Sequence, residues 1–130
     1  LITQMVEVRT YLDLLRTVNF RIAMDDFGTG YSPLRYLVDL PVDVVKFDIS
    51  LVNKLGQDNR AGQVVADFAR MMSDVGYSLV AEGVETEAVL RKVESLGIAH
   101  AQGYLLGRPV PLAELAANLA AEDVKATCNA

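Results

Sequence analysis

The sequence predicts an α/β fold in which four parallel strands alternate with helices. Four short apolar runs occur along the chain, and each is followed by a segment with helical periodicity. Apolar runs of this length are typical of strands that are buried on both faces. Strand–helix alternation produces a parallel sheet with right-handed crossovers. The predicted strands are residues 20–26, 44–50, 77–84 and 100–107.

The predicted helices have recognisable ends. Segment 1–18 places apolar residues at helical spacing, and the later helices begin at polar or proline caps and stop at glycines. The order along the chain is therefore one helix followed by four strand–helix units. The caps and stops are Ser32 with Pro33, Asp58 or Asn59, Gly76, Thr86, Gly97 and Pro111.

Two parallel architectures fit this order, an open doubly wound sheet and part of a (β/α)8 barrel. A complete barrel needs about 250 residues, so the four strands of this 130-residue chain would make about half of one. In both architectures, functional residues lie at the C-terminal ends of the strands. The polar residues expected there are Asp25, Asp26, Lys46, Asp48, Glu82, Glu85 and Gln102.

Composition narrows the classes of function. The chain is 52% hydrophobic, which is enough apolar material for a core, and its net charge of −5 disfavours binding of duplex nucleic acid or anionic membranes. Cys128 is the single cysteine, so no internal disulfide forms and a reducing cytoplasm is the expected location. No apolar run reaches membrane-spanning length, although a longer parent protein could be membrane-anchored upstream.

Adjacent aspartates end the first predicted strand. Asp25 and Asp26 would face opposite sides of an ideal strand, but at the bend into the glycine-rich turn both can face one point. Two close carboxylates repel each other unless a cation, a proton or hydrogen-bond donors offset the charge. Carboxylate oxygens suit Mg²⁺ or Mn²⁺. The alternative is that Asp26 or Thr29 only shapes the turn and Ser32 caps the helix.

Lys46 and Asp48 form the second polar pair. Their spacing puts both on one face of the second predicted strand, while Val45, Phe47 and Ile49 occupy the other face. A lysine in a buried strand is costly unless it is paired or reaches solvent. Either both residues belong to a site, or they form a surface ion pair on an edge strand.

Three further polar residues lie near the ends of the last two predicted strands. Glu82 is at the end of the third strand, Glu85 just after it, and Gln102 on the fourth. Gly83 lets the backbone turn, so that Glu82 can point into a cavity at the strand ends. Glu85 precedes the helix and can simply favour its positive N-terminus. Gln102 can donate or accept hydrogen bonds.

Four motifs at the predicted strand ends, DDFGTGYS, KFD, AEGVET and QGYLLGRP, occur in the order found in the EAL domain family, which the chain resembles. Members of this family are bacterial cyclic di-GMP phosphodiesterases with a modified (β/α)8 barrel. The resemblance reaches about Leu115 and implies the C-terminal half of such a barrel. Residues 1–19 would be its leading helix, 20–115 four strand–helix units, and 116–130 the helix end and tail.

The resemblance implies a site for two Mg²⁺ or Mn²⁺ ions. Asp25 is expected to bridge both ions, and Asp26 and Glu82 are expected to bind the second. Such ions neutralise a phosphodiester, lower the pKa of a bound water and stabilise the leaving oxygen in an in-line displacement. The substrate would be cyclic di-GMP and the product the linear dinucleotide pGpG.

The remaining roles are also implied by the resemblance. Lys46 would lie beside the nucleophilic water and the scissile phosphate, and Gln102 would contact the substrate in the same cavity. Both are expected to be catalytic together with Glu82. Glu85 would support the loop after DDF, and the helix from Ser32 onward would form a homodimer contact.

The sequence departs from the family in one large respect. The Glu-Ala-Leu motif that names the family, and an asparagine and a glutamate from the following strands, are not in this chain. The string EAVL at 87–90 lies inside a predicted helix and does not replace them. We therefore expect the chain alone not to hydrolyse cyclic di-GMP, and the upstream half of the barrel to supply the missing ligands.

Two other readings remain open. The chain could be a degenerate EAL module that binds cyclic di-GMP or a protein partner without cleaving it. It could also be a receiver-like α/β domain, a fold that uses paired acids and a lysine for Mg²⁺ and phosphoryl chemistry. In a receiver the lysine ends a late strand, whereas Lys46 follows the acidic pair on the very next strand.

Overall fold

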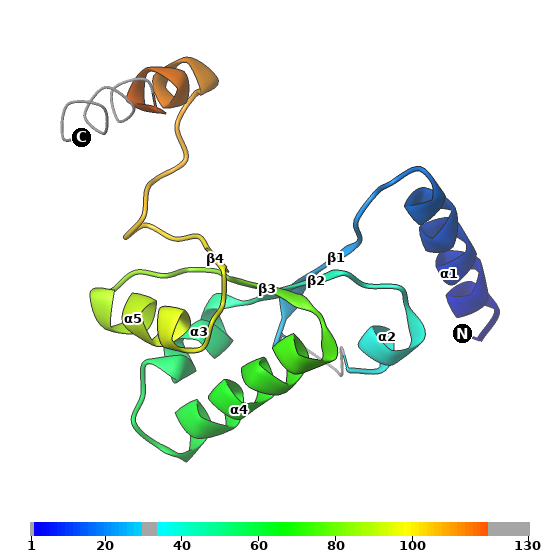
Figure 1. The fold of residues 1–130 in the computed structure, drawn as a ribbon, viewed down its shortest axis with the longest axis horizontal. Coiled ribbons are helices and arrows are strands. Elements are labelled where there is room, and N and C mark those ends of the chain that lie inside the picture. The colour runs from blue at the N-terminus through cyan, green and yellow to red at the C-terminus, as the bar shows by residue number, and fades with distance from the viewer. Residues whose placement is uncertain (1, 30–33, 120–130) are drawn as a thin grey trace.

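A computed structural model describes residues 2–29 and 34–119 of the chain and contains one four-stranded parallel sheet. The strands lie in the sheet in their chain order, β1-β2-β3-β4 (Figure 1). Every crossover therefore steps in the same direction, which a doubly wound sheet does not do because its strand order reverses. The bounds are β1 Ala23–Phe27, β2 Val44–Phe47, β3 Ser78–Ala81 and β4 His100–Ala101.

Helices alternate with these strands, as the sequence predicts. Helices α2 to α5 lie on one side of the sheet, below it in Figure 1, whereas α1 and the last helical segment lie beyond that layer at its two ends. No helix in the described parts of the chain is long and apolar enough to cross a membrane. The bounds are α1 Ile2–Thr17, α2 Leu34–Asp39, α3 Ile49–Leu55, α4 Arg60–Val75 and α5 Glu87–Ser95, followed by helical residues 112–119.

The core lies between the sheet and this helix layer. Val45 and Phe47 of β2 point toward the helices and are completely buried. Three aromatic rings stack there, with centroid separations of 5.7 Å for Phe27–Phe47, 5.4 Å for Phe27–Phe68 and 6.2 Å for Phe47–Phe68. The stack packs the end of β1 against β2 and α4, and its residue Phe27 immediately follows the adjacent aspartates.

The strands are not buried on both faces, contrary to the prediction. In β2 and β3, fully buried residues alternate with half-buried ones, and the half-buried residues include Val44, Lys46 and Val80. The four-stranded sheet is open, and within the described residues helices cover only one of its faces. The other face, which would be the interior of a closed barrel, is partly exposed to solvent.

The second strand is shorter than predicted, because a helix begins within the predicted range. The strand ends at Phe47, and Asp48 caps helix α3, its Oδ1 accepting a hydrogen bond from the Ser50 N–H at 2.8 Å. Ile49 is therefore a helical residue. The predicted partnership of Asp48 with Lys46 on one strand face is wrong, since the N-cap geometry turns the Asp48 side chain to its own helix.

The fourth strand is also shorter than predicted. Only His100–Ala101 pair with β3, and residues 103–106 turn back. The turn is closed by hydrogen bonds from the N–H groups of Leu106 and Gly107 to the Gly103 carbonyl, at 3.0 and 3.1 Å. The apolar run in this stretch thus belongs to a turn.

The remaining helix boundaries match the sequence closely. Asn59 caps α4, Thr86 caps α5, and Gly76 ends α4 in a left-handed conformation with φ of 104°. The leading helix and the helix after Pro111 are also present. The predicted Ser32–Pro33 cap lies outside the described residues.

Replacing the cap of α3 tests its contribution. Asp48→Ala should lower the free energy of unfolding by about 1 kcal/mol at pH 7. Hydrogen bonds from the Ser50 side chain and backbone hold the pKa of Asp48 below its ordinary value. A depressed carboxyl pKa stabilises the fold above the unfolded value of about 4 and loses that contribution as the pH falls through the folded value.

Urea titrations of both proteins at pH 7 and at pH 2.5 should therefore show a difference that disappears in acid. Glu7→Ala, on the exposed surface of α1, is the matched control and should leave the unfolding midpoint unchanged. A difference of equal size at both pH values would contradict the assignment of Asp48 as a charged cap.

Candidate metal centre

A β-bulge brings Asp25 and Asp26 to the same edge of the sheet. Met24 pairs with Val45, and Phe27 pairs with Phe47, so both aspartates lie opposite the single residue Lys46. Two residues facing one is the defining feature of a bulge, which bends the strand and redirects its side chains. The bulge therefore removes the alternation that would otherwise place the two carboxylates on opposite faces.

The backbone of Asp26 takes the conformation that this bulge requires. Its φ is 52°, in the left-handed region that aspartate tolerates better than most residues. The Asp26 carbonyl accepts hydrogen bonds from the Thr29 N–H at 3.2 Å and from the Thr29 hydroxyl at 2.9 Å. Asp26 and Thr29 thus do shape the turn, and Asp26 also contributes a carboxylate to the site.

Backbone hydrogen bonds beyond the strands fix Glu82 and Gln102 in register. The Glu82 N–H donates to the Phe47 carbonyl at 3.0 Å, and the Gln102 N–H donates to the Ala81 carbonyl at 2.8 Å. The next residue, Gly83, has φ of 66°, and a Cβ there would lie 2.5 Å from the Ile49 side chain. Glycine therefore allows the chain to turn away after Glu82.

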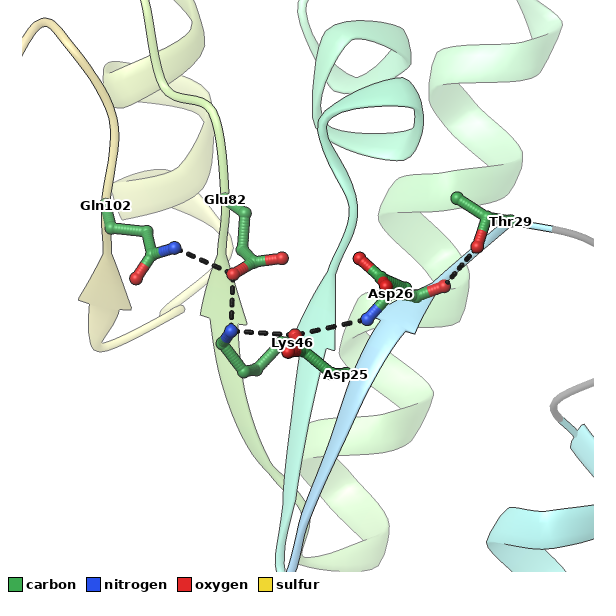
Figure 2. A network of polar contacts seen from close by, with 6 residues as sticks. All are labelled: Asp25, Asp26, Thr29, Lys46, Glu82 and Gln102. Atoms are coloured by element: carbon green, nitrogen blue, oxygen red, sulfur yellow. Dashed lines mark hydrogen bonds and ion pairs between the residues drawn. The ribbon is translucent and has the colours of Figure 1, made fainter.

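Lys46 is the centre of the polar network (Figure 2). Its Nζ lies 2.7 Å from Asp25 Oδ1 and 2.5 Å from Glu82 Oε1, and Gln102 Nε2 donates to the same Glu82 oxygen at 2.7 Å. The Lys46 and Glu82 side chains are 25% and 15% exposed, whereas Asp25 is 64% exposed. The network thus runs from a sheltered side at Glu82 to an open side at Asp25.

These contacts fix the charge of the lysine. Hydrogen bonds from Lys46 to Asp25, and next to Glu82, raise the pKa of the ammonium group, and the same contact with Lys46 lowers the pKa of Asp25. Lys46 is consequently an ammonium at neutral pH, able to donate to an anionic oxygen but not to act as a base.

Three carboxylates meet the requirements of a divalent cation site. One oxygen from each of Asp25, Asp26 and Glu82 can be chosen so that all three lie within 4.8 Å of one another. One ammonium offsets only one of three negative charges, so the cluster remains anionic. Hard oxygen donors in this number suit Mg²⁺ or Mn²⁺, so the residues present fit such an ion.

The other predicted site residues fall outside this network. Asp48 caps α3, and the surface ion pair between Lys46 and Asp48 is replaced by the pairing of Lys46 with Asp25 and Glu82. Glu85 is exposed and lines a neighbouring cleft. Its role in supporting the loop after DDF stays a prediction, since residues 30–33 lie outside the described chain.

Tyr104 and Arg108 line the same cleft, and their contact was not predicted from the sequence. The guanidinium carbon of Arg108 lies 4.3 Å from the centre of the Tyr104 ring. Both residues follow the fourth strand and line a cleft that begins at Gln102. An aromatic and a basic residue on either side of a short turn are the sequence signal that could have indicated it.

Comparisons with known proteins agree on one family. The family model described as the EAL domain matches residues 1–109. The chain is 40% identical over 109 residues to the bifunctional diguanylate cyclase/cyclic di-GMP phosphodiesterase MucR of Pseudomonas aeruginosa, covering 84% of this chain and 16% of MucR. It is 41% identical over 105 residues to the cyclic di-GMP phosphodiesterase PdeL of Escherichia coli, covering 81% of this chain and 29% of PdeL.

Solved structures give the same result. The EAL domain of Mycobacterium smegmatis DcpA superposes with a TM-score of 0.81 at 40% identity, over 89% of this chain and 52% of that one. The manganese and cyclic di-GMP complex of Klebsiella pneumoniae BlrP1 superposes with a TM-score of 0.70 at 38% identity, over 78% of this chain and 26% of that one. The four-stranded sheet is thus similar to part of an EAL barrel.

Opposite effects on Mn²⁺ affinity test the metal assignment. Asp26→Asn should weaken Mn²⁺ binding, because a divalent ion loses a full negative charge at ligand distance. Lys46→Met should strengthen it on the order of tenfold, because the competing ammonium is removed from beside the carboxylates. Water-proton relaxation during a Mn²⁺ titration of the purified chain measures both effects.

Lys54→Met removes an exposed lysine from α3 and is the matched control. It should leave the Mn²⁺ affinity close to that of the unmodified chain. Equal affinities for the Asp26 and Lys46 variants would rule out a cation site at this cluster.

Proposed function

Because the chain belongs to the EAL domain family, we propose that it carries half of the active site of a cyclic di-GMP phosphodiesterase. One observation carries this proposal. At the C-terminal strand ends, the ammonium of Lys46 lies among the carboxylates of Asp25, Asp26 and Glu82. Carboxylates that can hold a cation and a lysine that can contact a phosphate are both suited to phosphodiester hydrolysis. The relatives named as cyclic di-GMP phosphodiesterases support this choice of substrate.

The proposed reaction opens the cyclic dinucleotide at one phosphodiester. A water oxygen bonds to phosphorus, and the bond from phosphorus to one ribose oxygen breaks. The water loses a proton and the departing ribose oxygen gains one, so the product is linear pGpG. Two bound Mg²⁺ or Mn²⁺ ions would neutralise the phosphate charge and make a coordinated water more acidic.

Each residue of the polar network has a proposed role in this reaction. Asp25, Asp26 and Glu82 would hold the cations. Lys46 would release its carboxylate partners as the cations arrive and donate to a phosphate oxygen beside the attacking water. Gln102 would keep the Glu82 carboxylate oriented through the 2.7 Å hydrogen bond and contact the substrate from the position just after β4.

We propose that the rest of the active site comes from the upstream half of the barrel. The chain covers 16% and 29% of the two relatives described above, and 52% of the DcpA EAL domain. That half would pair with β1 and β4, whose outer edges have no strand partner in the described sheet. A homodimer contact through the helix after Ser32, and a cytoplasmic location, remain parts of this proposal.

A chimera with PdeL tests the proposed activity. The segment of PdeL that this chain matches would be replaced by the chain, so that the PdeL upstream half completes the barrel. The chimera should convert cyclic di-GMP to pGpG only when Mg²⁺ or Mn²⁺ is present, and Asp26→Asn should reduce the rate by about a hundredfold or more. The purified 130-residue chain should form no pGpG.

The chimera with Asp58→Asn, a loop aspartate before α4, is the matched control and should stay active. Appreciable metal-dependent pGpG formation by the chain alone would refute the need for an upstream half. A folded chimera that binds cyclic di-GMP in calorimetry but never cleaves it would favour a binding module over an enzyme.

A further inference from the structure

A cleft of about 660 Å³ opens directly beside the metal centre. It begins at Gln102, whose amide contacts Glu82, and continues along the turn that follows β4. Its volume is in the range that holds a small organic ligand. The side chains that carry the following proposal are those of Gln102, Tyr104 and Arg108.

The turn that carries Tyr104, and that leads directly to Arg108, is held against the segment after β3. The Leu105 N–H donates to the Val84 carbonyl at 3.1 Å, and the Val84 N–H donates to the Gln102 carbonyl at 3.0 Å. A Cβ on Gly103 would lie 2.2 Å from the Val84 carbonyl oxygen, so this close approach requires glycine. The position of the cleft wall is therefore fixed by backbone contacts.

Tyr104 in turn orients Arg108. The guanidinium stacks over the Tyr104 ring at 4.3 Å, which is within cation–π distance. Stacking uses the flat face of the guanidinium and leaves the N–H donors on its edge free to bind a ligand. A planar pair of donors on a residue that lines a cleft matches a ligand with two adjacent acceptor atoms.

We propose that Arg108, positioned by Tyr104, binds a guanine base of the substrate and selects guanine over adenine. This inference rests on the proposed function, because it assigns one base of the cyclic dinucleotide to the cleft beside the cleavage site. Guanine presents the adjacent acceptors O6 and N7, which an arginine binds with two hydrogen bonds. Adenine presents a donor amine in place of O6, and this amine opposes an arginine donor.

Nucleoside titrations of the 130-residue chain test the assignment without any catalytic step. In ¹H–¹⁵N NMR spectra, guanosine should shift the resonances of Gly103, Tyr104, Gly107 and the Arg108 side chain. Adenosine should bind at least about fivefold more weakly, the lower end of the discrimination that one such pair provides. Arg108→Ala should abolish this preference, and Tyr104→Leu should reduce it while Tyr104→Phe retains it.

Arg91→Ala removes an exposed arginine from α5 and is the matched control, since it should keep the guanosine preference. Equal shifts with guanosine and adenosine, or shifts with inorganic phosphate alone, would overturn the proposal. Undiminished guanosine binding by the Arg108 variant would also overturn it. Because guanosine binding needs neither cations nor the upstream half, this test can fail or succeed separately from the hydrolysis assay.

Discussion

Two adjacent aspartates opposite a single lysine set the geometry on which the candidate site depends. The bulge in β1 places Asp25 and Asp26 against Lys46, and the left-handed backbone of Asp26 keeps both carboxylates at the same strand end. The next residue along the chain, Phe27, stacks on Phe47 and anchors the bulge in the core. A regular strand in this position would lose one of the two carboxylates to the opposite face.

Electrostatics makes this arrangement suitable for a divalent cation. Lys46 bridges Asp25 and Glu82 and reduces the repulsion among three carboxylates, but it leaves the cluster anionic. An ammonium compensates at most one charge, whereas a divalent cation compensates two and accepts several oxygens at once. As an ammonium, Lys46 is also able to donate a hydrogen bond to an anionic oxygen. The lysine therefore joins carboxylates from the ends of two other strands in one polar network.

The order of the strands explains why residues far apart in the sequence meet. Each crossover steps to the next position in the sheet, so the ends of β1, β2, β3 and β4 form one continuous edge. Backbone hydrogen bonds continue this edge past the strands to Glu82 and Gln102, and a tight turn then carries the chain along the cleft to Arg108. The three carboxylates, the lysine and the cleft thus lie along a single line of strand ends.

The sequence by itself determined the α/β class, the caps of α4 and α5 and the residue types of the candidate site. These features depend on apolar periodicity and on local hydrogen bonding, which neighbouring residues specify. It did not reveal that Asp48 caps a helix, that two aspartates face one lysine, or that Arg108 stacks on Tyr104. The facing of two aspartates and one lysine was decided only by tertiary structure, because the register between strands depends on residues distant in the chain. The Asp48 cap and the Arg108–Tyr104 stack join residues close in the chain, but they lie in or beside apolar runs that predict strands.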